Sequence, residues 1–324
     1  MISPTPVPSS PALQQDVSLA DLSTLKVGGT ASWFTQAHNR QQFEQTRIWA
    51  KEQGLPIFYL GEGSNVLFSD EGFSGLIVQN CITGIEQYGE ELEIGGGQNL
   101  IEAVRRINRL KLSGMERLYG IPGTLAGALV GNAGAYGQQI SDLVVEVSVW
   151  SDHQLQVPAV DLEFRYRYSL FQRQRDWFIL NCRLRLQTSS EPLQDISDEI
   201  LTQRLVKYPQ ELRCPGSFFK NIPLDEVSKT VLEKIPDDFI MFGKIPAGKL
   251  LEAVGANGVR HGDAQFADYH GNLIINLGQA TSQDILTLAD EYAGRVWERF
   301  RIRLEPEILI VDDGNWTNLR GRDE

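Results

Sequence analysis

Glycine density in one stretch constrains this chain more than any other feature of its sequence. The stretch GIPGTLAGALVGNAGAYG, Gly120 to Gly137, contains six glycines in eighteen residues. Two explanations are open: a close backbone crossing inside a core, or a flat or charged ligand that lies directly against the backbone. Glycine at this density favours the ligand. Its most apolar part, Gly123 to Ala135, is shorter than the ~18 apolar residues of a membrane span and contains an asparagine, which excludes a transmembrane helix.

A second glycine-containing turn, LGEGSNVL at Leu60 to Leu67, follows an expected strand directly. Gly61 and Gly63 permit a tight turn and leave backbone N–H groups unshielded, and Ser64 and Asn65 add side-chain donors. Such a nest binds pyrophosphate oxygens without a lysine, although the pattern alone is more often only a turn. Neither stretch completes GxGxxG or GxxxxGK[ST], which disfavours Rossmann and P-loop folds. The remaining interpretation is a different dinucleotide-binding site, built from two separate loops.

Charge and cysteine content narrow the class of protein further. The chain has 324 residues and a formal net charge of −12, which argues against nucleic acid or an anionic membrane as a partner. Cys81, Cys182 and Cys214 are too scattered for a disulfide framework or a zinc site, and they indicate a reducing, cytoplasmic compartment. Residues 1–17 begin with a run rich in proline and serine, which predicts a disordered arm and neither a signal peptide nor an anchor.

Helix and strand patterns alternate along the chain, which predicts an α/β or α+β enzyme with two lobes. Ser282 is expected to cap the last helix, and the polar segment 187–191 before Pro192 is expected to be a domain boundary. We expect helices at 41–53, 99–110, 197–207, 247–254 and 281–300, and strands at 56–60, 76–78, 143–150, 177–186, 272–276 and 302–311.

Six motifs occur in a fixed order between about residues 20 and 311. They are TLKVGG (24–29), LGEGSNVL (60–67), GIPGTLAGALVGNAGAYG (120–137), YRYSLF (166–171), GSFFKN (216–221) and LEPE (304–307). Each motif alone is weak, but the six together resemble the UDP-N-acetylenolpyruvoylglucosamine reductases.

The resemblance implies an α+β fold. An FAD-binding fold of the vanillyl-alcohol oxidase (PCMH) type in two subdomains is expected over 18–189, a C-terminal α+β substrate-binding domain over 193–311, and a tail over 312–324. FAD is expected to be held non-covalently, with its pyrophosphate on the two glycine-rich stretches. The implied FAD contacts are Gly61, Gly63, Ser64, Asn65, Gly120, Pro122, Gly123, Thr124, Gly127, Asn132, Gly134, Ala135, Tyr136 and Gly137.

The same resemblance assigns three catalytic residues, Arg167, Ser217 and Glu307. NADPH is expected to reduce FAD, after which flavin N5 gives hydride to C3 of the enolpyruvyl ether and Ser217 protonates C2. The product is UDP-N-acetylmuramate, a peptidoglycan precursor. A guanidinium suits the substrate carboxylate, and Glu307 is expected to donate a hydrogen bond as a neutral acid or to orient Arg167.

Simpler explanations exist for each of these residues. Arg167 lies in a charge-mixed run, Ser217 follows a glycine, and Glu307 could pair with Arg301 or Arg303. Their positions within the motifs favour the catalytic roles.

The interval between Arg167 and Ser217 is short and leaves no room for the substrate-capping tyrosine loop of one family branch. Another group must then close over the UDP end of the substrate. Lys207 is the candidate for phosphate, and Asn221 for uridine or diphosphate.

Two other functions stay open at this point. One is a flavin oxidase of the same fold; such enzymes often anchor FAD covalently through His or Cys, whereas neither glycine-rich stretch contains a histidine. The other is a flavin-binding or nucleotide-sugar-binding protein without turnover. We expect a monomer that binds a small UDP-sugar and requires no metal.

Overall fold

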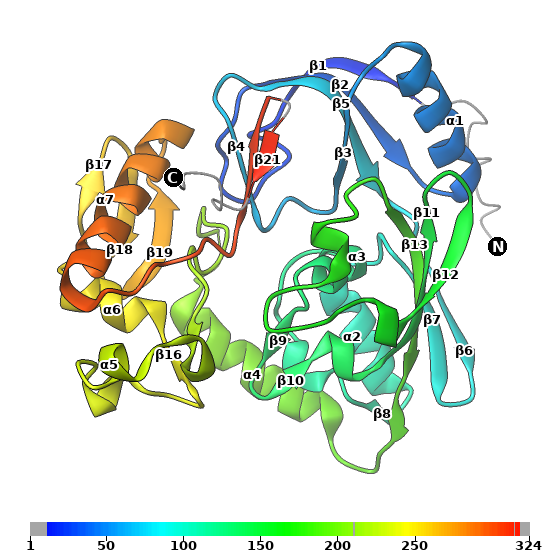
Figure 1. Cartoon of the computed structure of the whole chain (residues 1–324). Helices are drawn as coiled ribbons and strands as arrows, with labels where there is room; N and C mark the ends of the chain where they lie inside the picture. The colour runs from blue at the N-terminus through cyan, green and yellow to red at the C-terminus, as the bar shows by residue number, and fades with distance from the viewer. Residues whose placement is uncertain (1–11, 210, 314, 318–324) are drawn as a thin grey trace. The chain divides into compact units, whose positions relative to one another are not determined.

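The computed structural model describes residues 12–209, 211–313 and 315–317. The chain forms two compact units, and each is described by itself (Figure 1). Of the described residues, the first unit contains 12–16, 32–62 and 75–209, and the second contains 17–31, 63–74, 211–313 and 315–317. This division differs from the expected boundary at 187–191, because segments 17–31 and 63–74 are assigned to the second unit and the helix before residue 209 to the first.

A five-stranded antiparallel sheet forms the main layer of the first unit. Its order is β12 (Gln154–Pro158), β11 (Val144–Trp150), β13 (Phe178–Arg185), β7 (Glu91–Gly95), β6 (Ile85–Tyr88). Helix α2 (Leu100–Arg109) begins after Asn99, whose side chain accepts a hydrogen bond from the Glu102 amide, as an N-cap does. Leu100, Val104 and Ile107 share a core with the sheet, as their helical spacing predicts.

A second sheet has the order β1 (Gln14–Ser18), β2 (Thr30–Ala37), β5 (Phe73–Asn80), β3 (Ile57–Leu60). Strand β1 occupies the end of the segment expected to be a disordered arm; residues 1–11 of that arm lie outside the described residues. Helix α1 (Arg40–Glu52) lies beside this sheet (Figure 1). Its Phe43 stacks on Phe178 with ring centroids 3.9 Å apart.

Shorter elements complete the first unit, among them α3 (Leu125–Val130), β9 (Gly134–Ala135), β10 (Gln138–Gln139), β8 (Leu112–Ser113) and β14 (Gln187–Thr188). Helix α4 (Leu193–Lys207) begins directly after Pro192, four positions before the predicted start at Ser197. Ser197 is buried one turn inside the helix, where its hydroxyl donates to the Glu116 carbonyl.

The second unit contains a three-stranded antiparallel sheet of β17 (Arg260–His261), β18 (Ala264–Ala267) and β19 (His270–Asn276). Helices α6 (Ala247–Ala253) and α7 (Ser282–Phe300) lie beside it (Figure 1). A single core joins these elements through Leu250, Leu251, Phe266, Ile274 and Ile285. Strands β15 (Ile222–Pro223) and β16 (Lys244–Ile245) and the short helix α5 (Lys229–Leu232) fill the segment between Asn221 and α6.

Thr281, and not the expected Ser282, caps helix α7. The Thr281 hydroxyl accepts from the Asp284 amide at 3.0 Å, and the Asp284 carboxylate accepts from the Thr281 amide at 3.0 Å. This is a capping box, which satisfies two amides at the helix start. The Ser282 hydroxyl is engaged elsewhere, because it donates to the Asp70 carboxylate at 2.7 Å.

The strand expected over 302–311 is limited to β20 (Leu309–Asp312), which pairs in parallel with β4 (Val66–Phe68) and antiparallel with β21 (Asn315–Thr317). The residues just before β20 form backbone hydrogen bonds with a different segment, residues 218–220. The Glu305 carbonyl accepts from the Lys220 amide, and the Glu307 amide donates to Phe218. Pro306 between them has no N–H with which to extend a ladder.

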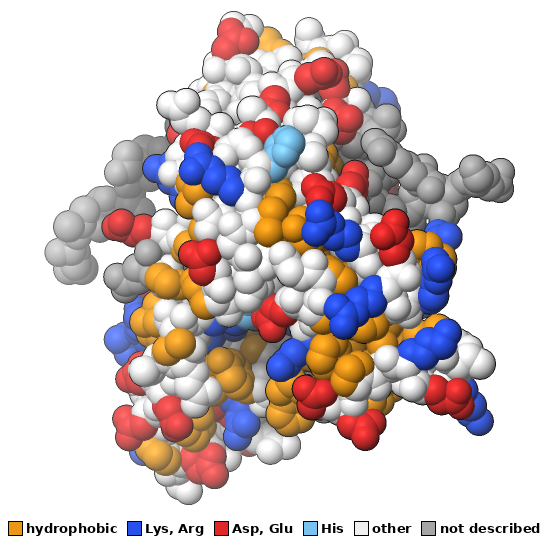
Figure 2. Space-filling model, turned by 90° about the vertical axis from the view of Figure 1, so that its left-hand side faces the viewer, with side chains coloured by type: hydrophobic (Ala, Val, Ile, Leu, Met, Phe, Trp, Pro, Cys, Tyr) orange, Lys and Arg blue, Asp and Glu red, His pale blue; other side chains and the backbone are white. Residues whose placement is uncertain are grey.

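The surface shows no concentration of one charge on the face drawn in Figure 2. Asp and Glu side chains are interspersed there with Lys and Arg, and no broad basic area is visible among the described residues of that face. Within the described part of the chain, no helix combines the length and apolar character that a bilayer crossing requires.

Candidate active site

The two glycine-rich stretches come into contact in the first unit. Gly61 follows β3, and a Cβ atom at this position would lie 2.7 Å from Oγ1 of Thr124. Thr124 caps helix α3, because its hydroxyl accepts from the Gly127 amide at 3.2 Å. Two segments that are far apart in the sequence therefore meet at Gly61 and Thr124.

A third glycine run, Gly95–Gly97, lies against the second stretch. The Ala126 amide donates to the Gly96 carbonyl at 2.8 Å. A Cβ atom on Gly96 would lie 2.4 Å from the Ile179 carbonyl oxygen, which is closer than packed atoms approach. In the sequence this run is only an incomplete GxGxxG motif. In the structure its glycines allow the backbone to pack closely against Ile179 and helix α3.

Open space lies beside several glycines of the long stretch. A Cβ atom on Gly127 or Gly131 would have its nearest neighbour at 3.6 or 3.7 Å, and one on Gly137 would have none within 4 Å. Gly137 (φ 86°) and Tyr136 (φ 51°) form the two-residue turn between β9 and β10, for which positive φ at both positions is typical. At Gly127 and Gly131 the packing of the protein itself does not require glycine, and the space beside them can accommodate a flat cofactor such as FAD. At Gly137 the positive φ itself favours glycine.

Arg167 is attached to the same stretch. It lies in a two-residue turn closed by mutual hydrogen bonds between Arg165 and Tyr168, and its φ of 51° is uncommon for a residue with a side chain. Its guanidinium donates to the Gly134 carbonyl at 2.9 Å and to the Asn132 carbonyl at 3.4 Å. Positive φ at a long polar side chain is the kind of strain that functional sites retain.

A second guanidinium, which the sequence analysis missed, is close to Arg167. Burial lowers the pKa of the Arg204 guanidinium, the hydroxyls of Tyr208 and Tyr136 oppose this shift, and the positive charge of Arg167 adds to it. A Cβ atom on Gly120 would lie 3.2 Å from Cδ of Arg204. Arg204 lies outside the six motifs. The sequence feature that could have identified it is its position one helical turn before Lys207 on α4, which places both side chains on one face of the helix.

Lys207, the predicted phosphate ligand, is the last residue of α4. Its ammonium lies 5.0 Å from the centroid of the Tyr208 ring, and the Arg204 guanidinium lies 5.4 Å from the same centroid. The first unit therefore gathers three cationic side chains, Arg167, Arg204 and Lys207, around the end of α4 and the glycine-rich stretch.

Ser217 and Glu307 lie on neighbouring segments of the second unit. The Glu307 amide donates to the Phe218 carbonyl at 2.8 Å, so Glu307 is bonded to the residue directly after Ser217. Phe219 and Pro306 form an antiparallel bridge in the same place. The structure thus brings together two of the three catalytic candidates, whose sequence positions are far apart.

Three of the other predicted ligands have structural partners in the second unit. The Asn65 amide donates to the Glu307 carbonyl at 3.1 Å, and the Asn221 oxygen accepts from the Ala247 amide at 3.1 Å. At Gly63 (φ 66°), a Cβ atom would lie 1.9 Å from the Leu22 carbonyl oxygen. Gly63 is therefore required by its own backbone, whether or not a ligand approaches it.

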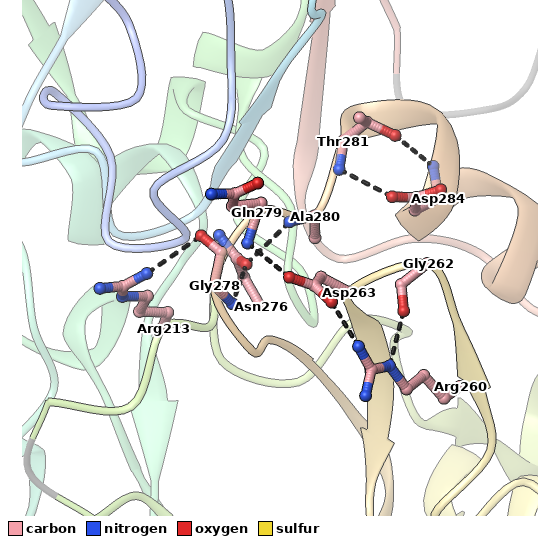
Figure 3. A network of polar contacts seen from close by, with 10 residues as sticks. All are labelled: Arg213, Arg260, Gly262, Asp263, Asn276, Gly278, Gln279, Ala280, Thr281 and Asp284. Carbon is pink, nitrogen blue, oxygen red and sulfur yellow. Dashed lines mark hydrogen bonds and ion pairs between the residues drawn. The ribbon is translucent and has the colours of Figure 1, made fainter.

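A polar network fixes the chain just before Ser217 (Figure 3). The Arg213 guanidinium donates to the Gly278 carbonyl at 3.2 Å, and the Arg213 carbonyl accepts from the Asn276 amide at 2.9 Å. The Asn276 oxygen accepts from the amides of Gly278 and Ala280 at 2.8 and 3.0 Å. The loop between β19 and α7 is thereby tied to the segment that leads to Ser217.

Comparison with known proteins decides the family. A model of the C-terminal domain of UDP-N-acetylenolpyruvoylglucosamine reductase matches residues 208–311, and a model of an FAD binding domain matches residues 31–153. The curated UDP-N-acetylenolpyruvoylglucosamine reductase of Solibacter usitatus is 35% identical over 93% of this chain and 97% of its own length. The chain belongs to the UDP-N-acetylenolpyruvoylglucosamine reductase family.

Further relatives agree. The reductase of Synechococcus sp. strain JA-3-3Ab is 36% identical over 92% of this chain and 91% of its own length. The crystal structure of the Thermus caldophilus enzyme superposes with a TM-score of 0.70 and 28% identity, covering 93% of this chain and 100% of that one. The expected α+β fold with its FAD-binding domain, the use of FAD and the assignment as an oxidoreductase are confirmed.

Proposed function

We propose that this reductase converts UDP-N-acetylglucosamine enolpyruvyl ether to UDP-N-acetylmuramate, with NADPH as the electron source. Two electrons and one proton leave NADPH as hydride, and the second proton comes from solvent by way of Ser217. Bound FAD supplies the hydride that is delivered to C3 of the enol ether. The substrate named for the relatives supports this proposal, together with the pairing of the Ser217 and Glu307 segments.

The observation that carries the proposal is the hydrogen bond between the Glu307 amide and the Phe218 carbonyl. It holds a hydroxyl and a carboxyl group on adjacent segments of one unit. We assign Ser217 as the donor of the proton to C2, because a carbanion-like carbon is basic enough to take a proton from a hydroxyl. We assign Glu307 to stabilise the negative charge that develops beside C2 by hydrogen bonding.

We assign Arg167 to the substrate carboxylate, with which a guanidinium forms two parallel hydrogen bonds. The nearby Arg204 is a further candidate for an anionic group of the substrate, since two partly buried guanidinium groups that repel each other are stabilised by an anion between them. Lys207 is proposed for phosphate and Asn221 for uridine or diphosphate. The Asn221 oxygen accepts from the Ala247 amide, and this bond leaves the side-chain N–H groups of Asn221 available for the role.

Ser217→Ala tests the proposal by separating the two half-reactions in rapid-mixing absorbance of the flavin. Reduction by NADPH precedes substrate binding and should be nearly unchanged. Reoxidation by the enolpyruvyl ether should slow by about 10²–10⁴-fold, because the positioned acid is gone. Ser217→Cys should restore part of the rate, since a thiol can donate from nearly the same place.

Equal slowing of both half-reactions by Ser217→Ala would mean that the serine is structural. A preparation without flavin that takes up no added FAD would contradict the cofactor assignment. Flavin that stays with the protein on acid precipitation would contradict non-covalent binding.

We also propose that the enzyme acts in the cytoplasm as a monomer. Cys81, Cys182 and Cys214, all within the described part of the chain, form no disulfide, which suits a reducing compartment. Size-exclusion chromatography with light scattering tests the monomer.

A further inference from the structure

Asn272, on strand β19, binds the backbone next to the proposed proton donor. Its side-chain oxygen accepts from the Phe219 amide at 2.8 Å, and its side-chain nitrogen donates to the Phe219 carbonyl at 2.8 Å. The side chain is almost fully buried, with 2% of its surface exposed. One amide therefore satisfies both backbone polar groups of Phe219, as a neighbouring strand would.

The backbone of Asn272 contributes to the same attachment, because its carbonyl accepts from the Phe218 amide at 2.9 Å. On their other side, Phe218 and Lys220 are bonded to Glu307 and Glu305. The segment that starts at Ser217 is thus held between β19 and the chain that carries Glu307. It has no regular strand of its own, so the Asn272 side chain provides hydrogen bonds that a sheet ladder would otherwise give.

Burial makes this attachment specific. A buried backbone N–H or carbonyl without a partner is costly, so the Phe219 peptide groups remain directed at the Asn272 amide. The orientation of Phe219 restricts Phe218, and through it the direction of the Ser217 side chain. A misplacement of about 1 Å in a reacting group can cost two orders of magnitude in rate.

We infer that Asn272 is a positioning residue for the protonation step, acting on Ser217 through the backbone of Phe218 and Phe219. The inference rests on the proposed role of Ser217 as proton donor. It assigns to Asn272 no contact with substrate or cofactor.

The test compares Asn272→Ala in the flavin-loaded enzyme with Asn108→Ala. Asn108 is also buried and donates to Ser197 at 2.9 Å, in a part of the first unit remote in sequence from the catalytic motifs. Asn272→Ala should slow flavin reoxidation by substrate about 10- to 100-fold and leave reduction by NADPH nearly unchanged. Asn108→Ala should lower stability without a selective effect on reoxidation.

The double variant Asn272→Ala/Ser217→Ala shows whether the effect passes through the serine. Once the hydroxyl is gone, removing Asn272 should slow reoxidation no further, because the two residues act as one unit. Equal slowing by Asn272→Ala with and without Ser217 would overturn the inference alone. An unchanged reoxidation rate in Ser217→Ala would overturn the proposed function first, and the inference with it.

Hydrogen exchange provides a readout that does not depend on activity. Amide exchange at Phe219 should be faster in Asn272→Ala than in the parent, and unchanged in Asn108→Ala. Unchanged protection of Phe219 would overturn the inference. Should Asn272→Ala fail to fold, Asn272→Leu has nearly the same shape as asparagine and removes both hydrogen bonds to Phe219, and it is subject to the same expectations and the same contradicting results.

Discussion

The two units hold their functional residues by different means. In the first unit, turns with positive φ at Asn132, Tyr136 and Arg167 shape the candidate site, and the Asn132 side chain supports them by donating to the Arg165 carbonyl. In the second unit asparagine side chains bind backbone groups around the site, and these residues are Asn65, Asn221, Asn272 and Asn276. A site shaped by turns is marked locally in the sequence by glycine, whereas a site held by amides depends on partners far along the chain.

The largest effect on stability is expected at Gly63, a residue of the second unit whose backbone has a positive φ, like the turns of the first unit. Gly63→Val should destabilise by more than about 4 kcal/mol, because its side chain would collide with the Leu22 carbonyl at a left-handed φ. Urea unfolding measures this. Gly54→Val is the matched control, since Gly54 has a φ of 67° but no atom within 4 Å of its Cβ position. The control should lose only about 1–2 kcal/mol, and an equal loss in both would contradict the collision.

Asn276→Ala should have the next largest effect, about 3 kcal/mol. The Asn276 amide donates to the carbonyls of Leu25 and Lys26 at 3.0 and 3.2 Å, and its oxygen accepts two further bonds within Figure 3. Buried groups that lose their partners cost about 1–3 kcal/mol each. The free energy of unfolding from urea titration checks the value. A loss below about 1 kcal/mol would mean that water replaces the amide and that the second unit is not held in this way.

Gly127→Val should change the stability of the flavin-free chain by less than about 1 kcal/mol, since valine and glycine differ little in helix propensity and the position has room. It should nevertheless abolish flavin retention, because the new side chain occupies the space proposed for the cofactor. Flavin absorbance per protein measures retention. Gly294→Val, at an open glycine of α7, should keep its flavin. Stoichiometric flavin in Gly127→Val would place the cofactor elsewhere.

The smallest effect concerns pH and the network of Figure 3. The Gln279 amide, together with Arg260, holds the pKa of Asp263 below its ordinary value of 3.8. A carboxyl whose pKa is lowered in the folded state stabilises above the unfolded pKa and loses that contribution as pH falls through the folded pKa. Asp263→Asn should therefore lower Tm slightly at neutral pH, and the difference should shrink below pH 3.8. A difference that stays constant in calorimetry from pH 7 to pH 3 would remove Asp263 from the network.

Local patterns predicted much of the fold and of the first unit's site. The spacing that predicts α2 lies within a few helical turns, and this prediction agrees with the structure. The glycines of the long stretch lie within one segment of the chain, and their contact with FAD stays a prediction. The capping of α7 was wrong by one residue, since Thr281 and Ser282 have similar side chains and only the partner Asp70 distinguishes them. The role of Asn272 depends on Phe219, 53 positions away, and no local pattern contains it.

The alternation of the chain between the units has a consequence for synthesis on the ribosome. Residues 17–31 and 63–74 emerge early but belong with the chain beyond residue 210. Strand β4 gains its parallel partner β20 only when residues 309–312 have been made. The first unit, complete at residue 209, can therefore fold while translation continues, whereas the segments of the second must wait, with apolar residues such as Leu67 uncovered. We therefore expect chaperones to bind residues 17–31 and 63–74 during translation.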